Sequence, residues 1–174
     1  MVIGPEYVYV AVPRTASKST SAWLVENYSG KYYGKAHHST HVPGGSRKKC
    51  VFAVVRDPYE RMRSYYVMSQ RPGGFGPPYF EAFVRWCRYG LPSNRSQVAM
   101  LKTVNVPLGD LLILRYETLV QDMQQLPFLQ PWVDLPVLNA SESKKPELTV
   151  AAIKAINRHS AEDFDRFGYT RLTV

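Results

Sequence analysis

The stretch that most constrains the fold is "CVFAVVRDPYE", residues 50–60, because a strand and the start of a helix follow one another in it. Residues 50–55 are continuously apolar and rich in β-branched side chains, which is typical of a central parallel strand buried on both faces. Asp57 can cap a helix, Pro58 fits the first helical position, and Glu60 can close a capping box. We therefore predict a strand over 50–55 followed directly by a helix.

A second strand, loop and helix are predicted near the N-terminus. Residues 7–12 form the strand, and residues 19–28 form the helix, whose inward face carries Trp23, Leu24 and Tyr28. The loop between them, "PRTASKST", holds small hydroxyl residues and two cations. A loop that ends in a helix N-terminus presents backbone N–H groups and the positive end of the helix dipole, so it can bind a phosphate or sulfate group. It contains no glycine, so the glycine-rich nucleotide signatures are absent.

The remaining elements alternate in the same way. The pattern predicts two further strands, over 32–36 and 111–116, of which the second is buried. It predicts helices over 79–89, 94–103 and 147–158 and a short last helix that ends in "DFDRFGY". Residues 127–145 are predicted to be irregular, because prolines interrupt them. Strands that alternate with helices favour a three-layer α/β/α fold with a central, mostly parallel sheet. In such folds ligands bind at the C-terminal ends of the strands, which is where both cationic loops fall.

Length and charge narrow the possible partners. A chain of 174 residues fits a single domain over 1–174 with one core. A net charge of +8, from 22 basic and 14 acidic residues, favours an anionic ligand. The basic residues are dispersed and form no zinc-finger, basic-zipper or RNA-recognition signature, so no nucleic-acid partner is expected. Without a bilayer-length apolar run or a leader pattern, we expect a cytoplasmic protein with no membrane partner.

Taken together, the two loops resemble those of sulfotransferases that use 3′-phosphoadenosine 5′-phosphosulfate (PAPS), particularly the branch of carbohydrate and related small bacterial or phage-type enzymes. "VPRTASKST" resembles the family's 5′-phosphosulfate loop, commonly Pro-Lys-x-Gly followed by three Ser or Thr residues. "VVRDPYERMRSYY" resembles its 3′-phosphate segment, with Arg56 and Ser64 eight residues apart. "LRYETL" at 114–119 and "DFDRFGY" at 163–169 resemble further recurring segments, so the likeness spans nearly the whole chain in order.

The resemblance implies a P-loop NTPase-like sulfotransferase fold and PAPS as the co-substrate, with 3′-phosphoadenosine 5′-phosphate (PAP) as its product. Arg14 stands where the family lysine contacts the sulfuryl bridge, and Arg56 and Ser64 would hold the 3′-phosphate. Arginine replaces the usual lysine at 14, and Ala16 stands at the usual glycine, where an alanine is tolerable if its φ stays negative. The residues that would wrap the phosphosulfate are Thr15, Ala16, Ser17, Lys18, Ser19 and Thr20.

The expected reaction is transfer of the sulfuryl group to a hydroxyl of a carbohydrate or small metabolite. By analogy with phosphoryl transfer, catalysis consists of positioning and of stabilising charge on the leaving phosphate, with Arg14 and Lys18 as candidates. No metal is expected, because the leaving group carries fewer charges than that of ATP and no acidic cluster resembles a magnesium site. The resemblance places a general base after the second strand, where His38 and His41 are equal candidates, with His37 behind them.

Other interpretations stay open. "SKST" resembles the end of a Walker loop, which favours a P-loop-like nucleotide kinase, but its glycines would fall at Val12 and Ser17. The basic surface also fits a non-catalytic binder of anionic glycan or nucleic acid, and the three histidines fit a metal site or a solvated loop. Tyr116 and Glu117 are interpreted as residues that pack the strand end against the phosphate loops. No pattern indicates an oligomeric state.

Overall fold

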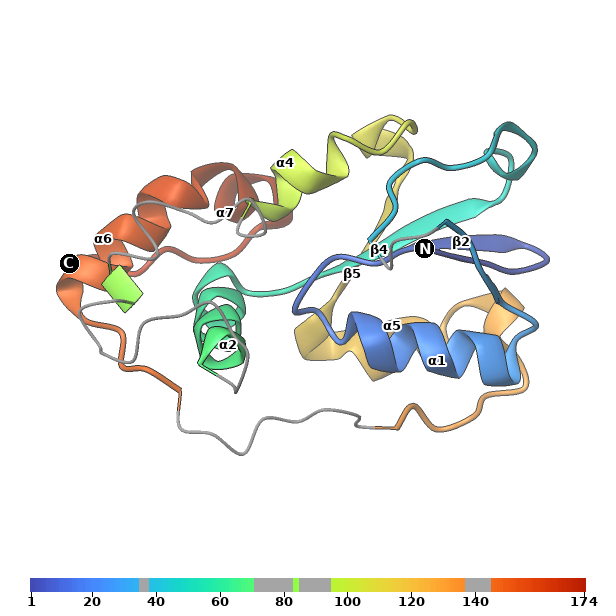
Figure 1. The fold of residues 1–174 in the computed structure, drawn as a ribbon, viewed down its shortest axis with the longest axis horizontal. Coiled ribbons are helices and arrows are strands. Elements are labelled where there is room, and N and C mark those ends of the chain that lie inside the picture. The colour runs from blue at the N-terminus through green and yellow to red at the C-terminus, as the bar shows by residue number, and fades with distance from the viewer. Residues whose placement is uncertain (35–37, 71–82, 85–94, 137–144) are drawn as a thin grey trace. The chain divides into compact units, whose positions relative to one another are not determined.

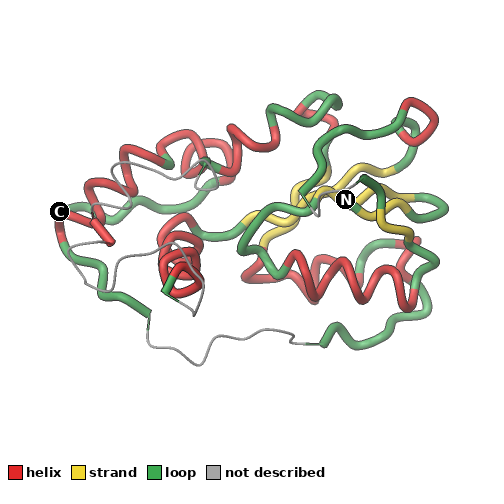
Figure 2. The backbone as a smooth tube through the Cα atoms, viewed as in Figure 1, coloured by secondary structure: helices red, strands yellow, loops and turns green. Residues whose placement is uncertain are grey.

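The computed structural model describes residues 1–34, 38–70, 83–84, 95–136 and 145–174, and these form two compact units. The sheet unit comprises Met1–Arg56 and Met100–Ala140, and the helical unit comprises Asp57–Ala99 and Ser141–Val174. Each unit therefore draws on two separate stretches of the chain, and the single-domain prediction stays a prediction. Figure 2 shows the described strands gathered in the sheet unit. Among the described helices, none has the length and apolar character needed to cross a membrane.

The described strands form one sheet in the order β3-β1-β2-β4-β5. Their bounds are β1 (Val2–Ile3), β2 (Tyr7–Val10), β3 (Lys31–Tyr32), β4 (Cys50–Val55) and β5 (Leu112–Arg115). β2, β4 and β5 pair in parallel, whereas β1 pairs antiparallel with both β2 and β3. Four of these five strands therefore run in one direction, and β1 runs in the other. The protein is a mixed α/β protein, as predicted.

Strand β4 lies where the sequence predicts it and is buried on both faces. One face of the sheet carries Tyr7, Tyr9, Phe52, Val54 and Leu114, and the other carries Val8, Val10, Val51, Ala53 and Val55; all ten side chains are buried. The prediction of a buried strand at 111–116 is wrong in part. Leu112 is 38% exposed and Leu114 is the buried residue of β5, because β5 lies at the edge of the sheet.

Helices α1 (Ser17–Asn27) and α5 (Leu119–Gln124) pack against the same face of the sheet (Figure 1). Trp23, Leu24 and Tyr28 point into this core, which confirms the predicted inward face. The sequence analysis did not predict α5. A helix of six residues is too short to show a helical period.

The segment after α5 contacts α1 and its C-cap residue. Within it, η5 (Pro127–Leu129) is a 3₁₀ turn, and the described residues 130–136 are irregular, as predicted. The Trp23 indole donates to the carbonyl of Val133 at 3.1 Å, and the Tyr28 hydroxyl donates to that of Pro131 at 3.1 Å. The segment is irregular in backbone but fixed by polar contacts to buried aromatic residues.

The helical unit is built from α2 (Pro58–Ser69), α6 (Val150–His159) and α7 (Ala161–Phe167), together with the first residues of α4 (Gln97–Leu101). Its core combines aromatic residues of α2 with small and branched residues of α6 and with Phe164. The buried Asp163 carboxylate accepts hydrogen bonds from the N–H groups of Gln97 (2.9 Å) and Val98 (2.8 Å) at the start of α4.

Several predicted elements lie partly outside the described residues, among them residue 94 of the helix predicted over 94–103 and residues 137–144 of the irregular segment predicted over 127–145. Of the helix predicted over 79–89, the structure describes only residues 83–84. The strand predicted over 32–36 is short, since β3 ends at Tyr32 and residues 35–36 are not among the described ones.

Candidate anion-binding site

The loop after β2 bends sharply at two residues that are not glycine. Arg14 has φ 68° and Ala16 has φ 59°, both in the left-handed region. The condition under which an alanine is tolerable at position 16, a negative φ, is therefore not met. The chain must turn from β2 into α1 within six residues, and the buried Thr15 hydroxyl closes the turn by donating to the Val12 carbonyl at 2.9 Å. A left-handed residue with a Cβ costs about 1–2 kcal/mol.

The N-terminus of α1 begins at Ser17, two residues before the predicted start. Ala16 is the cap residue, and an alanine side chain cannot accept a hydrogen bond. The first bond within the helix runs from the Thr20 N–H to the Ala16 carbonyl at 3.0 Å, so the helix itself provides no carbonyl for the N–H groups of residues 17–19. Residues 17–20 include no acidic side chain. This arrangement favours binding of an external anion.

The side chains of this first helical turn differ in exposure. Ser17, Ser19 and Thr20 are buried, whereas Lys18 is exposed. Tyr9 of β2 lies beneath them and is fully buried. Burial raises the pKa of Tyr9 far above its ordinary value, although the neighbouring hydroxyls of Thr20 and Thr15 act in the opposite direction. Tyr9 therefore stays neutral and supports the loop as a packing residue.

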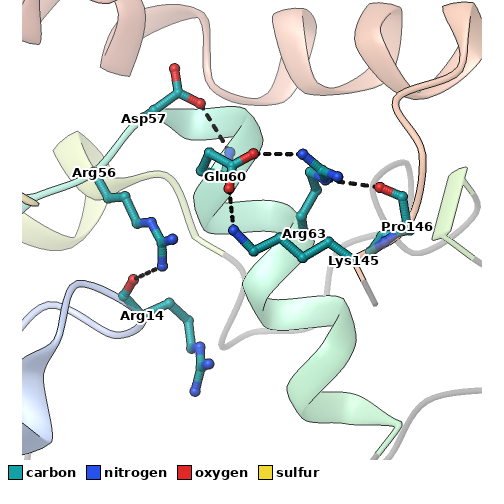
Figure 3. A network of polar contacts seen from close by, with 7 residues as sticks. All are labelled: Arg14, Arg56, Asp57, Glu60, Arg63, Lys145 and Pro146. Carbon is teal, nitrogen blue, oxygen red and sulfur yellow. Dashed lines mark hydrogen bonds and ion pairs between the residues drawn. The ribbon is translucent and has the colours of Figure 1, made fainter. Parts of the chain in front are cut away.

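Arg56 joins the second predicted motif to the first. It directly follows β4, and its guanidinium Nη1 donates to the Arg14 carbonyl at 3.3 Å (Figure 3). The guanidinium carbon also lies 4.1 Å from the centre of the Tyr116 ring. The beginnings of the two cationic motifs are thus in contact at the C-terminal edge of the parallel strands, within the sheet unit.

Ser64, the predicted partner of Arg56, belongs to the helical unit, where it is buried on α2. The predicted cap of α2 is confirmed, because the Asp57 carboxylate accepts from the Glu60 N–H at 2.9 Å and Pro58 occupies the first turn. This helix therefore carries an anion of its own at its N-terminus.

The Glu60 side chain forms an ion-pair cluster in the helical unit. Its carboxylate accepts from Arg63 at 2.7 Å and from Lys145 at 2.5 Å (Figure 3). Burial acts to raise the pKa of Glu60, but the hydrogen bonds from Lys145 and Arg63 outweigh it and hold the pKa below its ordinary value. Arg63 also donates to the Pro146 carbonyl at 2.8 Å. The charge of Lys145 is thus paired with Glu60.

The structure distinguishes between the candidate histidines. The ring Nδ1 of His38 lies 2.8 Å from the Ala11 carbonyl, at the end of β2. A carbonyl oxygen only accepts, so Nδ1 carries the hydrogen and the neutral ring keeps its lone pair on Nε2. His38 and His41 are both exposed, and His37 lies outside the described residues. His38 is therefore the histidine that is attached to the strand that leads into the loop.

Asn105 is a residue of this region that the sequence analysis missed. The Val42 N–H donates to its Oδ1 at 2.6 Å, and its Nδ2 donates to the Val42 carbonyl at 2.9 Å. The histidine segment is thus anchored at His38 by Ala11 and at Val42 by Asn105. A lone asparagine 63 residues away in the chain carries no sequence signal for this contact.

No group of three or more His, Cys, Asp or Glu residues in the described part of the chain is placed to hold a metal ion. Comparison with known proteins finds no matching family model, no matching curated protein and no matching solved structure. The chemistry of the site is therefore inferred from its own residues.

Proposed function

We propose that this protein transfers a sulfuryl group from PAPS to a hydroxyl of a carbohydrate or small metabolite. The observation that carries the proposal is the contact between Arg56 and the Arg14 carbonyl. It joins two candidate anion-binding motifs, whose arginines lie 42 residues apart in the chain, at one edge of the sheet. A ligand with two separated anionic groups, such as PAPS, matches a pair of motifs of this kind. The fold proposed with it is the three-layer, P-loop NTPase-like fold of sulfotransferases.

The proposed cradle for the phosphosulfate is the loop that leads into α1. Its N–H groups and the hydroxyls of Ser17, Ser19 and Thr20 donate to the anion, supported by the charges of Arg14 and Lys18. The conformation of Ala16 supports this role: its φ of 59° lies in the region that favours glycine, and the family that the loop resembles commonly has glycine there.

The proposed 3′-phosphate ligand within the sheet unit is Arg56. An arginine offers a planar fork of charged donors. Because Arg56 already contacts the Arg14 carbonyl and the Tyr116 ring, its head group is held before a ligand binds.

In the proposed reaction, the acceptor oxygen attacks sulfur in line with the bond to the 5′-phosphate. The new oxygen–sulfur bond forms as the old one breaks, PAP leaves, and the hydroxyl proton passes to Nε2 of His38. Arg14 and Lys18 offset the negative charge that grows on the leaving phosphate, an effect worth roughly 3 kcal/mol for one well-placed donor. The hydrogen bond from Nδ1 to Ala11 supports His38 as the base, since it fixes the tautomer.

Calorimetry with PAP tests the proposal. We expect micromolar binding that weakens at least about tenfold in Arg56→Ala, because charge-assisted hydrogen bonds to a phosphate are lost. Arg47→Ala, which removes the same charge from an exposed position, is the matched control and should bind normally.

Three outcomes would contradict the proposal. The first is no binding of PAP, or equal weakening by Arg56→Ala and Arg47→Ala. Magnesium-dependent hydrolysis of ATP would support the kinase instead. Binding that falls steeply with salt and shows no preference for PAP over a sulfated glycan would indicate a non-catalytic binder.

A further inference from the structure

Arg56 and Tyr116 occupy matching positions directly after neighbouring strands. Strands β4 and β5 are parallel, and Val55 is the register partner of Arg115. Arg56 and Tyr116 are the residues that directly follow this pair. The guanidinium carbon lies 4.1 Å from the ring centre, well within the roughly 6 Å over which a cation is attracted to an aromatic face.

The turn that carries Tyr116 is itself fixed. Tyr116 begins a 3₁₀ turn, η4 (Tyr116–Thr118), directly after β5. The Asp122 carboxylate of α5 accepts from the Arg115 N–H at 3.2 Å and from the Thr118 hydroxyl at 2.8 Å. These two bonds hold Arg115 and Thr118, which lie before and after the tyrosine, so the turn that carries its ring is tied to α5.

On its other side, Arg56 contacts the loop that leads into α1. Its Nη1 donates to the carbonyl of Arg14, a residue in the left-handed conformation. An arginine side chain is otherwise rich in rotamers, and fixing it only when a ligand arrives lowers affinity. Contacts on both sides remove part of that cost in advance.

We propose that Tyr116 is a positioning residue of the anion site, which holds the Arg56 guanidinium against the Arg14 carbonyl. The α5 helix, through Asp122, then sets the geometry of the loop by way of Tyr116 and Arg56. The identity of the ligand in this inference rests on the proposed function, but the contact itself does not.

The first experiment measures PAP affinity in three variants. Tyr116→Leu removes the aromatic face and should weaken binding about fivefold, the size expected for one cation–π contact. Tyr116→Phe keeps the face and should bind within about twofold of the wild type. Tyr32→Leu is the control, because Tyr32 is 58% exposed on the opposite edge strand, β3, and should have no effect.

The second experiment needs no nucleotide. In the NMR spectrum of the ligand-free wild type, the ring current of Tyr116 should shift the Arg56 Nε–H signal upfield. This shift should persist in Tyr116→Phe and vanish in Tyr116→Leu. The wild-type spectrum tests the contact even if the leucine variant fails to fold, since an unshifted Arg56 signal would overturn the inference.

The two experiments separate this inference from the proposed function. If the wild type does not bind PAP but the Arg56 signal behaves as described, the proposed function fails and the positioning role stands. If the phenylalanine variant loses affinity as severely as the leucine variant, or the Arg56 signal is the same in all variants, the positioning role is wrong.

Discussion

Helices α1 and α2 follow similar stretches of sequence, but their N-termini are capped differently. Each follows a central parallel strand, and each is preceded by an arginine. At α1 the cap is Ala16, in a left-handed conformation and without a side-chain acceptor. At α2 the cap is Asp57, whose carboxylate binds the Glu60 N–H, and Pro58 begins the helix.

Because the two helices are capped differently, the two motifs can bind an anion in different ways. Because α2 has a carboxylate at its own N-terminus, an anionic ligand at the second motif must be bound by side chains such as Arg56. The N-terminus of α1 has no such internal anion, and its loop keeps two strained residues, a feature that clusters at ligand-binding sites. The α1 loop is therefore the part of the protein suited to enclosing an anion with backbone N–H groups.

The largest effect that we expect is at His38, which is bound to the strand leading into α1. His38→Ala should lower the rate of sulfuryl transfer by about 100-fold or more, the size typical of losing a general base. PAP affinity should change little. Transfer from labelled PAPS to a panel of simple sugars and phenols measures the rate, and hydrolysis of the donor provides a second readout.

His41→Ala is the matched comparison for this prediction. It removes an exposed histidine from the same segment and should retain most of the activity. A large loss in His41→Ala together with a small one in His38→Ala would show that the base is His41.

At α2 we expect an effect on stability. Asp57→Ala removes the carboxylate cap and should lower the free energy of unfolding by about 1 kcal/mol, whereas Asp57→Asn, which can still accept, should lose less. Urea unfolding measures the difference, with the exposed Asp110→Ala as control. An Asp57→Ala protein as stable as the Asp110→Ala control would mean that the cap contributes nothing.

At α1 a smaller effect of opposite sign is expected. Ala16→Gly relieves the left-handed strain of about 1–2 kcal/mol but makes the unfolded chain more flexible, so it should stabilise the protein by about 0.5 kcal/mol. The control is Ala22→Gly in the middle of the same helix, which should destabilise by about 1 kcal/mol. Equal destabilisation by both changes would refute a strained Ala16.

The sequence predicts the elements whose signals are local and complete. The apolar run of β4, the cap of α2 and the inward residues of α1 lie within a few positions of one another, so each can be recognised without the fold. Both halves of the candidate site are found in this way, because the loop before α1 and Arg56 are each marked by a short motif.

What the sequence does not predict depends on long-range contacts or on position in the sheet. The exposure of β5 follows from its place at the edge, which its apolar residues do not reveal. The two hydrogen bonds that hold the Val42 backbone come from Asn105, which is 63 residues away in the chain. Alanine has no preference for a positive φ, so the bend at Ala16 is imposed by the turn. The choice of His38 depends on reaching Ala11, which only the folded chain shows.

The most direct test of the contrast between the two helices is an NMR titration of backbone amides with PAP. We expect saturable shifts at the amides of Ser17 and Lys18, because an anion enclosed by the α1 loop accepts from that turn. The Glu60 amide, already bonded to Asp57, should shift much less. Equal or larger shifts at Glu60, with Ser17 and Lys18 unchanged, would show that the α1 loop does not enclose the anion.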